Sequence, residues 1–395
     1  MLGKVLIVDW SSSAYDSLRG LLRQAADQLA EQGFEIRTVT FGSPGWDRTL
    51  MAELGTGGFS FALGMSGIGS DLFTTDKKLL WESANVPFFN WNCDHPCYFV
   101  SRHRIRSQFL LHGYVFPDHA RYSLRHLNAN AATYAVHMGI PPRRIFPERS
   151  MAAAGRNGRL VFSKSGQDVN AIEARWKGAP EPIRDLLPQA AEELRTSATS
   201  RFLPVLQGLA APYGLFIEGN GELAIHLIRE LDAYTRFRRA DDVVRALLAY
   251  PVDVYGTGWD HIDWSGARAR LRGPVGWNEM LRSLPRYLGS VSVNPLIDES
   301  VHDRVFFALA AGVVPVSDAN AFSRIELPEL KDYLFDVTPE SVRAAADAIL
   351  SDPQRAIDRT EMAHDRLWPR FSMAQSARQI VQFVSQRGLN ARCDI

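Results

Sequence analysis

The segment from Val291 to Asp318 constrains the fold of this chain more than any other stretch, because four structural elements follow one another in it. Its sequence is VSVNPLIDESVHDRVFFALAAGVVPVSD. The first apolar run predicts a buried strand, and an acidic loop then leads to a helix start that carries His302 and Arg304. Small residues fill the helix, and Val313–Val316 predicts a second buried strand. This order is that of a βαβ unit in a parallel sheet.

The same alternation of strands and helices runs through both halves of the chain and predicts an α/β fold with two doubly wound, Rossmann-like sheets. In the first half we predict strands at Lys4–Asp9, Phe34–Phe41, Phe59–Met65, Val86–Trp91, Gly113–Phe116 and Ala132–Val136. In the second half we predict strands at Arg159–Ser163, Val252–Tyr255, Val291–Asn294 and Val313–Val316. Residues 171–230 are predicted to be helical with a break at 211–214, and further helices are predicted at 75–84, 118–127 and 240–248.

A proline-rich stretch around Pro141, Pro142 and Pro147 separates the two halves and predicts a linker. We therefore expect a first domain over residues 1–155 and a second over 156–372. Residues 373–395 are expected to form a C-terminal helix that packs back on the first domain. Two such domains predict a ligand in a central cleft between them, where the two switch-point crevices face each other.

Composition excludes several classes of partner. The 395 residues carry 44 Lys and Arg against 44 Asp and Glu, which disfavours nucleic acid and anionic membrane surfaces as partners. No apolar run is long enough to span a bilayer, and the N-terminal apolar stretch is too short for a secretion signal. The three cysteines, Cys93, Cys97 and Cys393, form no disulfide framework, which is typical of the cytoplasm. Because no second pair of ligands accompanies Cys93 and Cys97, we expect no metal.

Strand ends in the second half are predicted to converge on one rim of the sheet. They carry the loop Gly256-Thr257-Gly258-Trp259, then Asn294 with Glu299 and Ser300, and then Ser317 and Asp318. Glycines allow close approach of the backbone, and an exposed tryptophan offers a surface for a nucleobase. The alternative interpretation is that Trp259 anchors the core and that the glycines only turn the chain.

The start of the helix beside that rim predicts an anion site. A helix N-terminus presents free backbone N–H groups, and Arg304 adds a fork of donors while His302 adds another. Together with the glycine loop, this pattern favours a nucleoside diphosphate as ligand. A plain βαβ unit with a surface histidine and arginine is the alternative.

In the first half, Asp94 and His95 follow a predicted strand directly, and His137 ends another. A carboxylate beside an imidazole can take a proton from a hydroxyl group that lies within hydrogen-bond reach. We therefore predict Asp94, His95 and His137 as catalytic residues on the acceptor side. The alternative is a capping aspartate and a packed histidine.

Three common motifs are absent from the sequence. There is no Gly-x-x-x-x-Gly-Lys-Ser/Thr phosphate loop, no Gly-x-Gly-x-x-Gly after the first strand and no Gly-x-Ser-x-Gly elbow. Nucleotide kinases of the phosphate-loop type, dinucleotide dehydrogenases and serine hydrolases of the elbow type are therefore disfavoured.

The segment Val293–Asp318, with its His-Asp-Arg-Val-Phe and Ala-Leu-Ala-Ala-Gly runs, resembles the donor-site segment of GT-B-fold glycosyltransferases. The resemblance is closest to the spore-maturation, CgeB-like branch with its "glycosyl transferases group 1" C-terminal domain. The segment Val254–Trp259 is similar to the second donor loop of that branch. Asp94-His95-Pro96 resembles, less specifically, an element in the N-terminal half of related bacterial proteins.

This resemblance implies a bacterial hexosyltransferase that binds a nucleotide-sugar donor in its second domain and a glycan or protein acceptor on its first, with no metal and a lean towards retention. Arg304 and His302 would neutralise the leaving diphosphate. Many relatives have Glu after Arg-Val-Phe, where it holds the ribose hydroxyls, but this chain has Phe307. Either Glu299 or Asp303 takes that role, or the donor is held differently, or activity is reduced. A sugar-nucleotide epimerase or hydrolase and a catalytically silent binding protein remain alternatives.

Overall fold

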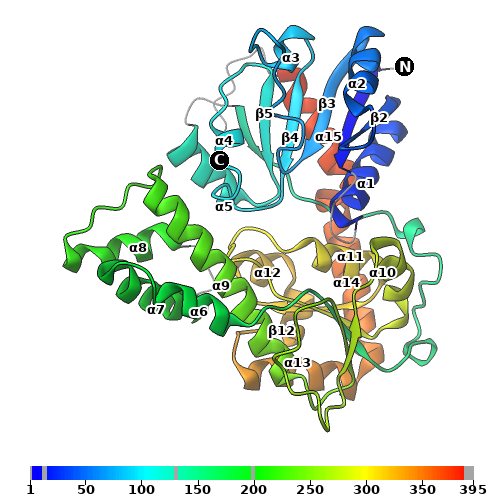
Figure 1. The fold of residues 1–395 in the computed structure, drawn as a ribbon. Helices are drawn as coiled ribbons and strands as arrows, with labels where there is room; N and C mark the ends of the chain where they lie inside the picture. Colours follow the sequence, from blue (N-terminus) through cyan, green and yellow to red (C-terminus); the bar gives the residue numbers. More distant parts are fainter. Residues whose placement is uncertain (1, 11–15, 129–131, 197–200, 387–395) are drawn as a thin grey trace. The chain divides into compact units, whose positions relative to one another are not determined.

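The structure is a computed structural model that describes residues 2–10, 16–128, 132–196 and 201–386 (Figure 1). These residues form two compact units. The first comprises Met1–Pro141 and the C-terminal segment from Arg370, and the second comprises Pro142–Pro369. The serines after Trp10 and the cysteine Cys393 lie outside the described residues.

The first unit is built on a six-stranded sheet in which every pair of neighbours is parallel. Its strands are β1 (Lys4–Trp10), β2 (Glu35–Phe41), β3 (Phe59–Met65), β4 (Phe88–Asn92), β5 (Leu110–Tyr114) and β6 (Ala132–Ala135). Their spatial order is β2-β1-β3-β4-β5-β6. All six strands expected from the sequence are therefore confirmed, with ends displaced by up to three residues.

The helices of the first unit are α1 (Ser17–Glu31), α2 (Trp46–Gly55), α3 (Leu80–Ser83), α4 (Val100–His103), α5 (Pro117–Tyr122) and α15 (Met373–Gln386). Helix α15 packs against α1, so the last described helix completes a unit that begins at the other end of the chain (Figure 1). The apolar face of α1, with Leu21, Leu22 and Leu29 buried, follows the helical period.

The second unit contains another parallel six-stranded sheet, with the order β12-β11-β10-β7-β8-β9. Its strands are β7 (Leu160–Ser163), β8 (Val252–Tyr255), β9 (Arg270–Gly273), β10 (Gly289–Ser292), β11 (Val314–Asp318) and β12 (Leu334–Phe335). Counted from β7, this is the strand order 3-2-1-4-5-6 of dinucleotide-binding Rossmann sheets. The sequence missed β9, because its residues are charged and largely exposed, and β12, because it has only two residues.

The helices of the second unit are α6 (Val169–Trp176), α7 (Glu181–Thr196), α8 (Phe202–Ala210), α9 (Glu222–Ala246), α10 (Trp277–Ser283), α11 (Asp303–Ala311), α12 (Ala321–Glu326), α13 (Pro339–Ser351) and α14 (Pro353–Phe371). Across the described ranges, no helix combines the length and apolar character needed to cross a bilayer. Helix α9 is continuous through residues 222–246, so the expected break between 230 and 240 is wrong.

Other helices also differ from expectation. The helix predicted over 75–84 is replaced by turns up to residue 79, and α3 begins only at Leu80, because the polar run Thr74–Lys78 has no apolar face to bury. Helices α2 and α14 were not predicted. The helix predicted over 118–127 begins at Pro117 and continues as a π-helical segment from Ser123 to Leu127.

Each sheet has one topological switch point, where consecutive connections leave on opposite sides. In the first unit it lies between β1 and β3, and in the second between β7 and β10. Ligands of open α/β sheets bind outside the carboxyl ends of the strands at such points. The strand order therefore predicts ligand sites at the loops after β1 and β3 and at those after β7 and β10.

Strand β5 of the first sheet buries an ionisable side chain. His112 on β5 is 1% exposed, and neither ring nitrogen has a hydrogen-bond partner among the described residues. Burial lowers the pKa of His112 from 6.5 to about 4, because the charged imidazolium loses its hydration. The residue is therefore neutral in the folded chain over most of the acidic range.

We expect the first unit to lose stability as the pH falls from about 6.5 towards 4. Over that range the unfolded chain binds a proton at His112 while the folded chain does not, a difference on the order of 3 kcal/mol for this pKa shift. Chemical denaturation at several pH values measures it. His112→Leu should reduce the pH slope of that stability. Equal slopes in wild type and His112→Leu would contradict this account.

Candidate nucleotide-diphosphate site

The candidate site lies at the switch point of the second sheet. Three segments meet there: residues 164–166 after β7, residues 256–259 after β8, and residues 293–302, which connect β10 to α11. Parallel strands bring their carboxyl ends to the same edge, so these segments share one rim of the sheet.

The first two loops are tied together through their backbones. Lys164 N–H donates to the Tyr255 carbonyl at 3.0 Å, and Gly166 N–H donates to the Thr257 carbonyl at 2.8 Å. Gly258 has φ +76°, and a Cβ atom there would lie 2.2 Å from the Gly166 carbonyl oxygen. Close approach of two backbones therefore requires glycine at this point, while Thr257 is exposed at the rim.

Trp259 lies beneath these loops and not on their surface. Its side chain is 1% exposed, its Nε1–H donates to the Lys164 carbonyl at 2.9 Å, and a Cβ atom on Gly166 would lie 2.5 Å from the indole. The prediction that Trp259 offers a stacking surface to a nucleobase is therefore wrong. The indole is a core anchor that fixes the position of Lys164.

Asn294 is also buried, and it holds the loop before α11 in position. It is 2% exposed, its backbone N–H donates to Asp318 Oδ1 at 2.7 Å, and its side-chain oxygen accepts the His302 N–H at 2.7 Å. Arg239 on α9 pairs with the other carboxylate oxygen of Asp318 at 3.4 Å. Asn294 thus holds the start of α11 in place from inside, and its role is to position the loop.

Ser300 is likewise buried, at 1% exposure, and its carbonyl accepts a hydrogen bond from Asn320 Nδ2 at 2.7 Å. The side chain of Asn320 also caps α12. The polar residues expected to face a donor at 294 and 300 therefore face the protein. In contrast, Glu299 beside them is exposed.

His302 and Arg304 do lie together at the N-terminus of α11, as predicted. His302 is the N-cap residue, and Arg304 Nη1 lies 3.2 Å from His302 Nε2. His302 Nδ1 accepts the backbone N–H of Arg304 at 3.4 Å, which caps the helix, and the same nitrogen faces the Asp303 carboxylate. Burial lowers the pKa of His302, with Asp303 opposing the shift and Arg304 adding to it, so the ring is neutral at pH 7.

The structure adds two cations that the sequence did not reveal. Lys164 follows β7, and Arg236 on α9 forms an ion pair with Asp232 at 2.9 Å. Burial, together with smaller effects of the nearby Arg304 and Arg236, lowers the pKa of Lys164 to about 7, and Asp232 opposes that shift. Burial also lowers the pKa of Arg304, opposed by Asp303. The side chains of Lys164, Arg236 and Arg304 therefore lie close enough at this rim for their positive charges to repel one another.

Mutual repulsion of these half-buried cations favours an anionic ligand. A diphosphate would offset the repulsion and accept hydrogen bonds from the side chains of Lys164 and Arg304 beside the N-terminus of α11. Among the described residues, no group of three or more His, Cys, Asp or Glu is placed to hold a metal ion. The residues present at this rim thus fit an anion.

Phe307, which stands where the family resemblance implies Glu, packs in the core of the second unit. Phe307 is 3% exposed, and its ring contacts Trp277 and Phe146 edge-on, with centroids 5.1 and 6.4 Å apart. The carboxylate of Asp303 pairs with His302. Of the two substitutes expected from the sequence, Glu299 is therefore the one exposed at the rim.

In the first unit, the predicted catalytic residues differ in accessibility. His95 is 3% exposed, its Nδ1 accepts the Cys97 N–H at 3.2 Å, and its ring contacts His119 and Tyr122. It is the packed histidine of the alternative interpretation, because a base must be reached by its substrate. Asp94 and His137 are half-buried, and the ring of His137 contacts Phe371. Their catalytic roles stay predictions.

A family model described as "Glycosyl transferase-like" matches residues 236–382 of the chain. The match runs from within α9 to α15 and includes Arg236 and Arg304, whereas Lys164 and Asp232 lie before it. No curated protein sequence matches the chain significantly.

Solved structures of glycosyltransferases share the fold over nearly the whole chain. An alpha-glucosyltransferase (AGT) in complex with UDP is 9% identical, with TM-score 0.57 and coverage of 97% of this chain and 100% of that one. The alpha-glucosyltransferase in complex with UDP and a 13-mer DNA is 10% identical, with TM-score 0.53 and the same coverage. Sucrose-phosphate synthase from Thermosynechococcus elongatus is 11% identical, with TM-score 0.51 and coverage of 98% and 100%. The fold is thus GT-B, with two Rossmann-like units.

The close contact between the loops after β7 and β8 predicts that Gly258→Ala lowers the stability of the second unit. Gly266 is a matched control, because it has a similar φ of +69° but nothing within 4 Å of an added Cβ. We expect Gly266→Ala to cost about 1–2 kcal/mol for the left-handed backbone and Gly258→Ala to cost more, since the two loops must also separate. Scanning calorimetry measures both. Equal losses would show that the loops are not packed as described.

Proposed function

We propose that this chain is a glycosyltransferase that binds a nucleotide-sugar donor at the rim of its second sheet and transfers the sugar to a hydroxyl acceptor. The cluster of Lys164, Arg236 and Arg304 beside the N-terminus of α11 carries the proposal. The GT-B fold and the glycosyltransferase-like match over residues 236–382 support it.

The cluster suits the chemistry of the donor. When the bond between the sugar C1 and the phosphate oxygen breaks, negative charge builds up on the departing diphosphate. Lys164 and Arg304 would stabilise that charge, and the dipole of α11 points its positive end the same way. His302 would act through Arg304, whose Nη1 lies 3.2 Å from its Nε2.

The ribose of the donor needs an acceptor of hydrogen bonds. We assign that task to Glu299, because it is exposed at the rim whereas Phe307 is buried. The backbone of Gly256–Gly258 would lie against the nucleoside without a side chain in the way, and Thr257 is exposed beside it.

Several further properties belong to the same proposal. Transfer is metal-independent, because side chains meet the diphosphate charge, and it proceeds with retention at C1, as the family resemblance implies. The sugar is a hexose, the protein is of the CgeB-like branch and works in the bacterial cytoplasm, and its acceptor is a glycan or a protein hydroxyl. The balanced charge of the chain argues against nucleic acid as acceptor.

A base on the first unit would accept the proton of the acceptor hydroxyl as its oxygen bonds to C1. Asp94 and His137 are the candidates that remain, since both are half-buried rather than buried. Proton NMR of the product's anomeric centre distinguishes retention from inversion.

Phe307 in place of the usual Glu supports one alternative function, which is a protein that binds donors without turning them over. An epimerase or hydrolase is the other alternative outcome. Both differ from a transferase in products: an epimerase interconverts sugars, and a hydrolase releases sugar to water with no need of an acceptor.

The experiment is a survey of UDP-, GDP- and dTDP-sugars with release of free nucleoside diphosphate as readout. We expect Arg304→Ala to lower kcat/KM by about 10²–10³, because it removes a donor from the developing charge. Arg282→Ala, an exposed arginine on α10, is the matched control and should turn over like wild type. EDTA in place of added Mn²⁺ should leave turnover unchanged.

Normal turnover by Arg304→Ala would remove this residue from the site. Loss of activity in EDTA with recovery in Mn²⁺ would overturn metal independence. Binding of every donor without any turnover, seen as a shift in melting temperature, would identify a silent binding protein.

We further expect UDP affinity to fall as the pH rises from 7 to 9. The pKa of Lys164 is about 7 in the free protein, and a bound diphosphate raises it, so binding is coupled to proton uptake. The UDP phosphates are already ionised in this range, so the change reports the protein. The slope should reach at most about tenfold per pH unit. Isothermal titration calorimetry in buffers of different ionisation enthalpy measures the proton uptake directly.

Lys164→Arg is the control, because arginine stays charged at every pH used. Its UDP affinity should be nearly independent of pH between 7 and 9. An unchanged pH dependence in that variant would show that another group takes up the proton.

A further inference from the structure

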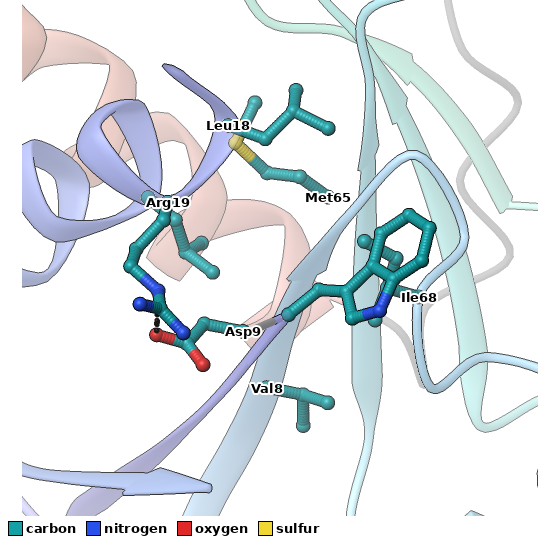
Figure 2. A pocket seen from close by; sticks show the side chains of 8 residues that line it. Val8, Asp9, Leu18, Arg19, Met65 and Ile68 are labelled. Atoms are coloured by element: carbon teal, nitrogen blue, oxygen red, sulfur yellow. Dashed lines mark ion pairs between the residues drawn. The ribbon is translucent and has the colours of Figure 1, made fainter. Parts of the chain in front are cut away.

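Side chains close the switch point of the first sheet. Arg19 Nε pairs with Asp9 Oδ2 at 3.1 Å, and Leu18, Met65 and Ile68 pack around this ion pair (Figure 2). The hollow that the described side chains leave there is too small for a ligand. A second binding surface therefore has to lie elsewhere on the molecule.

Helix α8 and the loop after it carry a strip of uncharged side chains that faces solvent. No charged residue occurs between Arg201 and Glu218. The exposed residues of this stretch on α8 are three or four positions apart, so they share one face of the helix, and two aromatic residues of the loop continue it. We call this set the α8 strip; its members are Pro204, Gln207, Gly208, Ala211, Tyr213 and Phe216.

The aromatic residues of the α8 strip are exposed although their loop is held in place. Phe216 is 81% exposed and Tyr213 is 42% exposed. The carbonyl of Ile217, whose side chain is buried, accepts a hydrogen bond from Gln207 Nε2 at 2.9 Å, and Gln189 Nε2 donates to Tyr213 Oη at 3.4 Å. Aromatic side chains that a fixed backbone presents to solvent are typical anchors of protein interfaces.

The fold of the second unit does not require the α8 strip. The opposite face of α8, with Phe202, Leu206 and Ala210, is buried, and α8 packs there on α7 and α9 (Figure 1). A Cβ atom added at Gly208 would have nothing within 4 Å. The strip is therefore an apolar surface left over after the core has formed, and such surfaces mark interaction sites.

Charge at the two ends of the α8 strip indicates what covers it. Arg201 begins α8, Glu218 follows the loop at the other end, and both are exposed. On the adjacent α7, Arg184 pairs with Asp185. An anionic lipid surface would be repelled by the acidic end of the strip. A second copy packed antiparallel would instead place each basic end against an acidic end.

We propose that two copies of this chain form a dimer with twofold symmetry through their α8 strips. A twofold contact uses the same patch on both copies, so the patch has to be complementary to itself. The α8 strip meets this requirement, because its middle carries no charge that would repel its own copy and its ends carry opposite charges. This inference does not depend on the proposed function.

The first experiment is sedimentation velocity of the full chain over a series of concentrations. We expect a monomer–dimer equilibrium in the wild type. Phe216→Asp should weaken the dimer on the order of a hundredfold, because the substitution removes an anchor and adds a charge on both sides of the contact. Phe73→Asp is the matched control, because Phe73 is an exposed aromatic residue of the first unit. It should dimerise like wild type.

Reversal of the end charges tests the antiparallel arrangement. Arg201→Glu and Glu218→Arg should each weaken the dimer, because each places like charges against one another twice. A mixture of these two variants should form a heterodimer, since every end contact then joins opposite charges. The double variant should dimerise like wild type. Arg106→Glu, which reverses an exposed charge in the first unit, is the control and should leave the dimer unchanged.

Three outcomes would overturn the dimer. The first is a folded wild type that stays monomeric up to about 100 µM. The second is a dimer that Phe216→Asp and both charge reversals leave unchanged. The third is a monomer that floats with phosphatidylcholine vesicles unless Phe216 is replaced, which would assign the strip to a lipid surface. Circular dichroism confirms folding, and all variants should bind UDP like wild type, so that the dimer and the proposed function are tested separately.

Discussion

The hydrogen bond from the Trp259 indole to the Lys164 carbonyl fixes the backbone at the rim of the second sheet, where the cation cluster lies. It draws the loop after β7 onto the loop after β8, and the contact is close enough that Gly166 and Gly258 can carry no side chain. The buried indole fixes the backbone of Lys164. The core of the unit therefore keeps this lysine near Arg304, although the two positive charges repel each other.

A second set of contacts approaches the same cations from the other side. Arg239 on α9 holds Asp318, Asp318 holds Asn294, and Asn294 holds the first turn of α11. Burial raises the pKa of Asp318, and the charge of Arg239 opposes that shift. Helix α9 thus contributes Arg236 to the cluster directly and Arg239 to its support. Much of the polar sequence around the rim therefore consists of buried side chains that bond to other groups of the protein.

The sequence predicted the class of the fold well, because buried parallel strands such as β1 and β11 are nearly continuous apolar runs. It failed where that signal is weak, as in the charged β9 and in the two-residue β12. For the site, the pattern around His302 and Arg304 located the helix start. It could not tell a facing side chain from a buried one, so Trp259, Asn294 and His95 were assigned to surfaces they do not line. Lys164 was missed because a lysine after a strand carries no signal without its spatial neighbours.

The course of the chain at its C-terminal end has a consequence for biosynthesis. The face of α1 that forms among the earliest residues is covered by α15, the last of the described helices. Every strand of the second unit leaves the ribosome before that cover exists. The unit whose synthesis starts first is therefore the one completed last, and until then it exposes apolar surface that a chaperone can recognise.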